Sequence, residues 1–210
     1  LPTTWLDIVP PLLKPQIQFL FGDAIKGRIL LVKFKWNGEW IYLLNTYAPC
    51  GNDKASQNAR YYFFKFLNDN IDRYGRFIHL GDHNNLPDPD TDRITKDGAP
   101  LSQSNREDME TFDEYISSRL LNDTYMSNRT EFSGPIMMTN KSSTGKTYTR
   151  IDRSYHSPNL DDYIFIDSST CRTNSTPPFP LSSSHYPVSI SLQDPECKQV
   201  HQYRQIWRMN

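Results

Sequence analysis

The alternation of apolar and polar positions near the start of the chain predicts two strands joined by a tight turn. Apolar side chains dominate residues 28–35 and again residues 40–47. Asn37 and Gly38 lie between these runs, and this pair favours a two-residue hairpin turn because both residues tolerate a positive φ. We therefore expect an antiparallel hairpin. Residues 1–20 are interrupted by prolines and predict no element.

A helix and a buried strand are predicted after the hairpin. Asp53 can cap a helix that runs to about residue 73, because its carboxylate can accept hydrogen bonds from the first free N–H groups. Apolar residues at helical spacing predict the buried face of this helix: Tyr62, Phe63, Phe66, Leu67 and Ile71. The apolar run at 77–80 then predicts a buried strand. Strand, helix and strand in this order form the crossover unit of an α/β protein.

The second half of the chain predicts one more helix and three strands. The helix spans about residues 105–120, and its apolar face is formed by Met109, Phe112, Ile116 and Leu120. Residues 127–147 are expected to form a loop. The remaining strands are expected at 149–155, 163–167 and 186–192.

Composition narrows the class of protein. A length of 210 residues fits one domain with a substantial core. The formal net charge of -1 gives no overall basic field, so a nucleic-acid surface would have to be local. No apolar run is long enough to cross a membrane. Three widely spaced cysteines predict neither a zinc site nor a disulfide framework and fit an intracellular, reducing compartment: Cys50, Cys171 and Cys197.

A carboxylate and an amide follow the predicted strand at 77–80. Gly81 is expected to turn the backbone at the end of that strand. Asp82 and Asn84 are two residues apart, so in an extended chain they project the same way. Such oxygens suit a hard divalent cation and a phosphate group. The alternative is an ordinary turn, which Asp and Asn also favour.

Three more polar residues lie at the ends of predicted strands. Tyr47 closes the second strand, Asp152 could share a strand face with Arg150, and His185 precedes the last strand. Each has a simple structural alternative: a capping tyrosine, a carboxylate paired with Arg150, and a surface histidine beside Pro187. The order of the whole set along the chain favours a functional interpretation.

Four segments in this order resemble the successive motifs of the endonuclease/exonuclease/phosphatase superfamily, commonly Y-x-P, G-D-x-N, R-I-D and S-D-H-x-P. They are Tyr47-Ala48-Pro49, Gly81-Asp82-His83-Asn84, Arg150-Ile151-Asp152 and Ser184-His185-Tyr186-Pro187-Val188. The closest resemblance is to the apurinic-endonuclease-like domain of LINE-type (non-LTR) retrotransposons. It extends to Asp92-Arg93, to Leu121-Asn122-Asp123-Thr124-Tyr125, and to the tail Trp207-Arg208-Met209-Asn210, which is similar to a segment leading toward a reverse transcriptase.

This resemblance implies a two-sheet α/β sandwich that hydrolyses phosphodiesters with Mg²⁺ or Mn²⁺. Asp82 would activate water or manage the proton of the leaving group, and Asn84 would hold a phosphate oxygen; both would serve as metal ligands. Tyr47 would donate a hydrogen bond to the phosphate, His185 would stabilise its charge, and Asp152 would orient His185. The implied partner is DNA, with a nuclear location, no membrane and no small-molecule cofactor. The sequence gives no oligomeric state.

The chain departs from the family pattern in two places. Ser184 stands where the family has an acid that normally partners the imidazole. The family's glutamate metal ligand, which lies before Y-x-P, has no counterpart, since Glu39 lies in the predicted hairpin turn and Asp7 and Asp23 are poor substitutes.

The missing glutamate and the absence of an initiator Met lead us to expect a chain that lacks the first strands of its fold. The expected organisation is an undefined segment at 1–24, the nuclease-like domain at 25–193 and a linker at 194–210. Three functional hypotheses remain open. One is a DNA-nicking endonuclease of a retroelement, impaired by truncation and by Ser184. Another is an inactive remnant that binds nucleic acid or protein. The third is an enzyme of the same superfamily that acts on another phosphoester, such as an RNA tail or an inositol phosphate.

Overall fold

A computed structural model describes residues 16–19, 27–73, 75–100, 106–129, 136, 138–166, 184–185, 188 and 190–193. Its strands are β1 (Gln16–Phe19), β2 (Ile29–Trp36), β3 (Glu39–Tyr47), β4 (Phe77–Asp82), β5 (Arg93–Thr95), β6 (Asn122–Asp123), β7 (Asn140–Lys141), β8 (Thr147–Thr149), β9 (Asp152–His156), β10 (Ile164–Ile166) and β11 (Ile190–Leu192). Its helices are α1 (Lys54–Asn70), α2 (Pro89–Asp92), α3 (Glu107–Ser118), α4 (Thr124–Ser127) and the 3-10 helix η3 (Pro158–Leu160).

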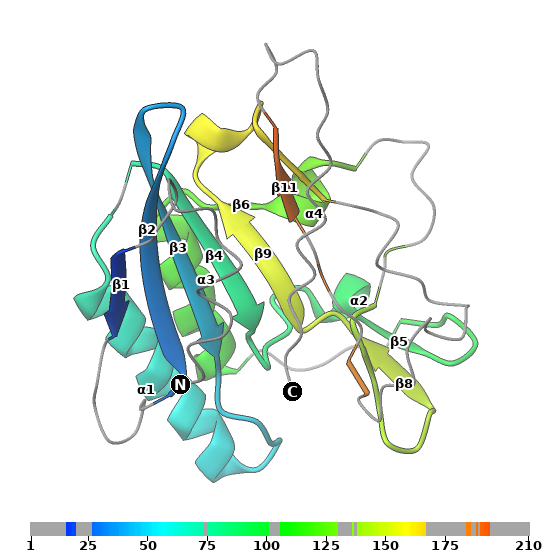
Figure 1. Ribbon diagram of the computed structural model, residues 1–210. Helices are drawn as coiled ribbons and strands as arrows, with labels where there is room; N and C mark the ends of the chain where they lie inside the picture. The colour runs from blue at the N-terminus through cyan, green and yellow to red at the C-terminus, as the bar shows by residue number, and fades with distance from the viewer. Residues whose placement is uncertain are drawn as a thin grey trace.

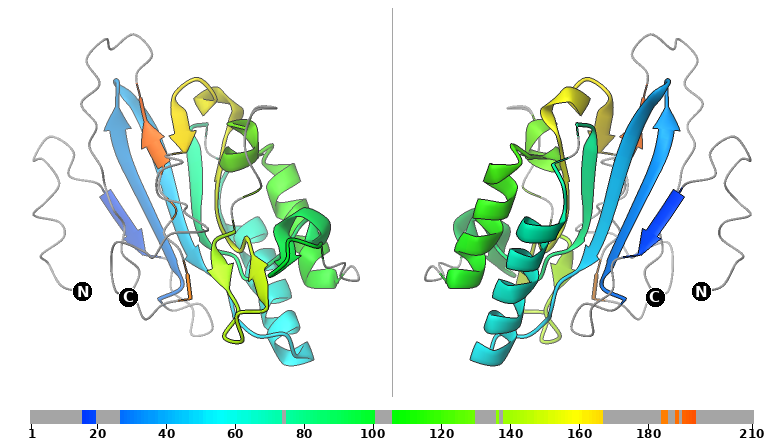
Figure 2. Two further views of the ribbon diagram at one scale, coloured as in Figure 1. Left: turned by 90° about the vertical axis from the view of Figure 1, so that its right-hand side faces the viewer. Right: turned by 90° about the vertical axis from the view of Figure 1, so that its left-hand side faces the viewer.

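A six-stranded sheet in the order β1-β2-β3-β4-β9-β6 forms the centre of the molecule (Figure 1). β3 and β4 are parallel and are joined through α1, as the predicted crossover requires. Helices α1 and α3 cover one face of this sheet (Figure 2). The two-stranded β10–β11 sheet packs on the opposite face, through a cluster that includes Ile41 and Ile78. The predicted two-sheet α/β sandwich is therefore confirmed.

The hairpin of β2 and β3 is formed as predicted. Trp36 pairs with Glu39, and the two residues between them have positive φ angles, 49° at Asn37 and 81° at Gly38. Side chains then alternate between the two faces: Leu31 and Leu44 face the helices, while residues one position away face the second sheet.

Helix α1 begins as predicted, with the Asp53 carboxylate accepting a hydrogen bond from Ser56 N at 2.9 Å. The prediction that Tyr62 lies on its buried face is wrong, because this side chain is 67% exposed. The buried face is rotated toward Arg60, Phe64 and Leu67. Arg60 fits there because it pairs with Asp108 of α3 at 2.7 Å, so its charge is not buried alone.

Helix α3 buries Met109, Phe112 and Tyr115 against the core. Leu120, which was predicted on the same face, is 73% exposed. The helix ends before it, and Leu120 has a φ of 53°, so helical spacing no longer determines where its side chain points.

Several shorter elements differ from the sequence prediction. β1 lies inside the segment expected to be undefined and pairs antiparallel with β2. The strand expected at 149–155 is two strands, because β8 pairs with β5 and β7 in a separate three-stranded sheet, while β9 joins the central sheet. The loop expected at 127–147 contains β7. Residues 194–210 lie outside the described residues, and no helix among the described ones is long and apolar enough to span a membrane.

Candidate active site

Three of the predicted residues lie side by side across the central sheet. Tyr47 is the register partner of Asp82, and Asp82 is the register partner of Asp152. Tyr47 and Asp82 end their strands, whereas Asp152 begins the antiparallel strand β9 at the same edge. Since residues opposite one another in neighbouring strands project to the same face, the three side chains form a row.

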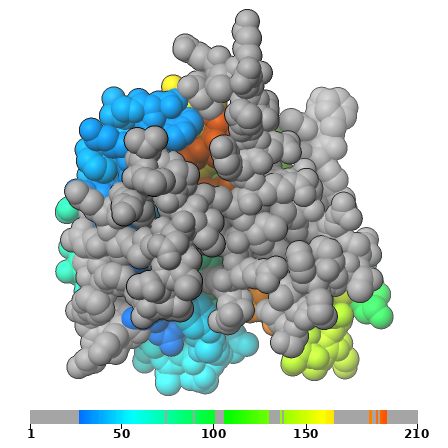
Figure 3. All heavy atoms as spheres, viewed as in Figure 1, coloured from blue at the N-terminus to red at the C-terminus, as the bar shows by residue number. Residues whose placement is uncertain are grey.

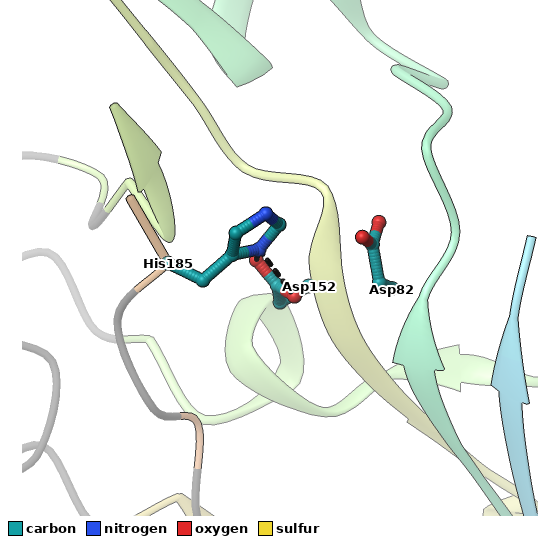
Figure 4. A group of neighbouring side chains, drawn as sticks. All are labelled: Asp82, Asp152 and His185. Carbon is teal, nitrogen blue, oxygen red and sulfur yellow. Dashed lines mark hydrogen bonds and ion pairs between the residues drawn. The ribbon is translucent and has the colours of Figure 1, made fainter. Parts of the chain in front are cut away.

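His185 joins this row through Asp152 (Figure 4). Its Nδ1 lies 3.0 Å from Oδ2 and 3.1 Å from Oδ1 of Asp152. A carboxylate can only accept, so Nδ1 is the donor and carries a proton. The ligand atoms of Asp82, Asp152 and His185 all lie within 4.8 Å of one another. The hydrogen bond to Asp152 is the main cause that raises the pKa of His185 above its ordinary value.

Asp82 is a buried carboxylate beside a second carboxylate. Its side chain is only 3% exposed, and burial, followed by the negative charge of Asp152, raises its pKa to about 6. The N–H of Asn84 donates to Oδ1 of Asp82 at 2.9 Å and opposes this shift. Near neutral pH the arrangement therefore places two like charges close together with little water, which a cation would stabilise.

Asn84 reaches Asp82 by a turn of the backbone, and the expected extended geometry is wrong. β4 ends at Asp82, and Asn84 has a φ of 46°. The left-handed conformation lets its N–H bond to Asp82 while its side-chain amide donates to the carbonyl of Ala48 at 3.0 Å. Asn84 thereby links the end of β4 to the segment after β3.

Gly81 is required for close packing. The expectation that it turns the backbone at the end of the strand is wrong. It lies within β4 at a φ of 151°, and a Cβ there would lie 2.0 Å from the carbonyl oxygen of Thr46. Any larger residue would push β4 away from β3 and separate Asp82 from Tyr47.

Tyr47 lies at one end of this row, and its side chain is 43% exposed. The Arg28 guanidinium lies 5.0 Å from the centre of its ring and donates to its carbonyl oxygen at 3.1 Å. Partial burial, followed by the interaction with Cys50, raises the pKa of the Tyr47 phenol. Its hydroxyl thus stays protonated near neutral pH and is available as a donor.

Two arginines and two aspartates form ion pairs around the first residues of β9. Arg150 pairs with Asp92 and with Asp123, each at 2.9 Å. Arg153 pairs with the same two carboxylates. Arg150 thus binds Asp92 and Asp123, and the sequence-based alternative in which it pairs with Asp152 is wrong. The resemblance pointed to Asp92 and Asp123 as motif positions but assigned them no role.

Two residues near the row were missed by the sequence analysis. Thr139 Oγ1 accepts a hydrogen bond from the N–H of Asp152 at 2.9 Å. Asn140 pairs with His185 through the backbone, and its side-chain amide donates to Ser184 Oγ at 3.2 Å. Both residues lie in the segment predicted as a loop, and no local pattern marks them because their partners are distant in sequence. Ser184 therefore contacts Asn140, and the carboxylate beside the imidazole comes from Asp152.

No protein-family model and no curated protein matches the chain. An AP endonuclease from Archaeoglobus fulgidus has a TM-score of 0.57 at 17% identity, over 86% of this chain and 71% of that chain. The 3′ phosphatase NExo from Neisseria, bound to product DNA hairpin, has a TM-score of 0.54 at 21% identity, over 86% and 71%. Truncated TDP2 from Caenorhabditis elegans has a TM-score of 0.51 at 17% identity, over 89% and 68%.

The chain has the endonuclease/exonuclease/phosphatase fold. The likeness covers 86–89% of this chain, and at these identities it establishes the fold alone. In this fold, the row of Tyr47, Asp82 and Asp152 lies at the C-terminal ends of β3 and β4.

The oxygen atoms of this row fit a divalent cation in part. Asp82 and Asp152 supply two carboxylates that are both negative when ionised, which is the donor chemistry that Mg²⁺ and Mn²⁺ prefer. Glu39 supplies none, because it lies at the tip of the hairpin, at the opposite end of β3 from Tyr47 (Figure 1). Asp7 and Asp23 lie outside the described residues.

Proposed function

We propose that the chain is a metal-dependent phosphodiesterase that nicks DNA. The observation that supports this most is the convergence of Asp82, Asp152 and His185 within 4.8 Å at one sheet edge. A phosphodiester is anionic and repels nucleophiles, so its hydrolysis needs a base, hydrogen-bond donors to the phosphate oxygens and a cation. The row and its surroundings offer a base in Asp82, donors in His185 and Tyr47, and two carboxylates that would hold the cation.

The proposed roles follow from the geometry of the side chains. Asp82, when ionised, accepts the proton of the attacking water. His185, held protonated by Asp152, donates from Nε2 to a phosphate oxygen. Mg²⁺ or Mn²⁺ bound at Asp82 would neutralise charge on the phosphate and acidify the water.

Two further residues would hold the substrate. Tyr47 donates a hydrogen bond from its hydroxyl to the phosphate, which its protonated state allows. Asn84 lies against Asp82 and would orient the water and a phosphate oxygen, and it remains a proposed metal ligand beside Asp82.

DNA is the proposed substrate because the chain shares its fold with an AP endonuclease and with NExo bound to product DNA hairpin. The origin in a retroelement, with a nuclear site of action, rests on the sequence motifs around Asp92 and at 121–125. The test is to incubate the chain with supercoiled plasmid and Mg²⁺ or Mn²⁺ and to measure open-circular product. Nicking that persists in excess EDTA would refute metal dependence.

The second candidate is an inactive remnant that keeps the fold and binds nucleic acid. It is favoured by the position of Glu39, since no described glutamate lies near Asp82. A hard cation with fewer carboxylates retains more of its water and binds more weakly. Plasmid binding without nicking, at Mg²⁺ or Mn²⁺ concentrations up to tens of millimolar, would support this candidate over the enzyme.

The nicking rate is expected to have a bell-shaped pH dependence. Asp82 must lose its proton, so the rate should rise through about pH 6 and fall about tenfold for each pH unit below that value. His185 must keep its proton, so the rate should fall again above its raised pKa. Because the proton and the cation compete for Asp82, more Mg²⁺ should move the acid limb to lower pH. A rate that does not fall below about pH 6 at low Mg²⁺ would contradict the role of Asp82, and a profile with no alkaline limb would contradict that of His185.

Asp152 is expected to matter much more than Ser184. Asp152→Asn weakens the hydrogen bond and removes the charge that together raise the pKa of His185, so it should lower the rate at neutral pH by about 10²-fold and move the alkaline limb to lower pH. Ser184→Ala removes only the contact with Asn140 and should lower the rate less than tenfold. Equal losses in the two variants would show that Asp152 is not the partner of the imidazole.

A further inference from the structure

The hairpin of β2 and β3 carries two lysines and a tryptophan on one face. Lys35 and Trp40 are register partners, and Lys33 lies two residues away on the same side of the ribbon. The Nζ atom of Lys33 lies 5.1 Å from the centre of the Trp40 ring, and that of Lys35 lies 5.3 Å from it. Two ammonium groups therefore converge on one indole, and we call these three residues the hairpin cluster.

The hairpin cluster is accessible and carries a net positive charge. Trp40 is 40% exposed, which is unusual for a large aromatic side chain that packs in a core. Lys35 is exposed as well. Among the described residues, neither lysine forms an ion pair with a carboxylate. Glu39 is adjacent in sequence but projects from the other face of the ribbon, since successive residues alternate. The two ammonium groups repel each other, and an anion bound beside them would stabilise both.

The hairpin cluster is separate from the candidate active site. Trp40 and Tyr47 lie seven residues apart on β3, which is about 23 Å along a strand. They also project from opposite faces of the central sheet, because one position is even and the other odd. Figure 1 shows the hairpin tip at the opposite end of the sheet from the end of β4, and Figure 3 shows the hairpin at a corner of the molecule.

We propose that the hairpin cluster binds single-stranded nucleic acid. An exposed indole offers a stacking platform that accepts any base, and the two ammonium groups would leave the ring face to contact the flanking phosphates. The combination favours a nucleic acid over an acidic peptide, because a peptide would use the two charges and leave the indole unused. This site is additional to the proposed nuclease function and does not require cleavage.

The test measures binding of a fluorescent single-stranded oligothymidine by anisotropy, in EDTA so that metal-dependent cleavage is suppressed. Trp40→Ala should weaken binding about five- to a hundred-fold, and Trp40→Phe should retain most of the affinity because it keeps a stacking face. The double variant Lys33→Gln/Lys35→Gln should reduce the slope of log K against log salt by about 0.7 for each lysine removed.

Matched controls separate the hairpin cluster from general changes in charge and aromatic content. Tyr62→Ala removes an aromatic side chain that is 67% exposed on α1, and Lys65→Gln removes an exposed lysine from the same helix. Both should bind the oligonucleotide like the unmodified chain. Thermal melting of every variant shows whether the fold is kept.

Three results would overturn the proposal. One is unchanged affinity in both hairpin variants, and another is an equal loss of affinity in the two controls. The third is tighter binding of polyglutamate than of the oligonucleotide, with the same dependence on the hairpin variants, which would identify an acidic protein as the partner. None of these results depends on whether the chain nicks plasmid, so the proposed nuclease function is tested separately.

Discussion

Replacement of Asp82 by alanine is expected to lower Mg²⁺-dependent plasmid nicking by about 10²- to 10⁴-fold, the usual loss when a general acid or base is removed. The side chain is at the centre of the row, with Asp152 on one neighbouring strand and Tyr47 on the other. No other described carboxylate apart from Asp152 belongs to the cluster around His185. The removal of the Asp82 carboxylate thus takes away both the proposed base and a proposed metal ligand.

Asp82→Asn separates this catalytic loss from a loss of folding. The folded state raises the pKa of Asp82 to about 6, so the ionised carboxylate disfavours folding at neutral pH. An uncharged amide of nearly the same shape removes that penalty. We expect Asp82→Asn to be inactive yet at least as stable to urea at pH 7 as the unmodified chain.

The matched control for Asp82 is Asp69→Ala. Asp69 lies on α1, where its side chain is 56% exposed and pairs weakly with Lys65 at 3.9 Å. Its removal should leave the nicking rate unchanged. A rate in Asp82→Ala that equals the rate in Asp69→Ala would exclude Asp82 from the chemistry.

Replacement of Asp92 by alanine is expected to lower the free energy of unfolding by about 3–5 kcal/mol, the usual cost of breaking a buried ion pair. Asp92 is completely buried, and it binds both Arg150 and Arg153. Asp123 cannot compensate for two guanidinium groups alone. Urea unfolding measures the loss, and such a loss would be a large part of the stability of a domain of this size.

The exposed pair of Lys65 and Asp69 is the control for the buried charges. Its removal should change the free energy of unfolding by no more than about 0.5 kcal/mol, because surface ion pairs contribute little. If Asp92→Ala were as mild as the surface variant, the four-charge group would be a minor support of β9.

Local signals predicted the main elements correctly. The Asn37-Gly38 turn, the Asp53 cap and the apolar spacing of α1 and α3 are properties of short segments, so the sequence alone predicts them. Their errors lie at helix faces and ends. Tyr62 and Leu120 are exposed because the packing of each helix against the sheet, and the point where α3 stops, depend on distant residues.

Arg60 and Gly81 have roles that local sequence patterns do not predict. A buried arginine such as Arg60 contradicts a pattern based on hydrophobicity, and only its contact with Asp108 explains it. Gly81 could be interpreted as a turn residue until the approach of Thr46 showed why a side chain cannot fit there.

By itself the sequence determined the fold class and the residue types of the candidate active site. Periodicity within short stretches indicated an α/β protein. The two-sheet sandwich, and the roles of Tyr47, Asp82, Asn84, Asp152 and His185, were implied by the resemblance of short motifs to a known family. The resemblance implied that Asp152 orients His185, but only the tertiary structure showed this contact and its support by Thr139 and Asn140. These contacts join segments far apart in the chain. Such contacts are fixed by strand register and packing, which no local pattern of residues specifies.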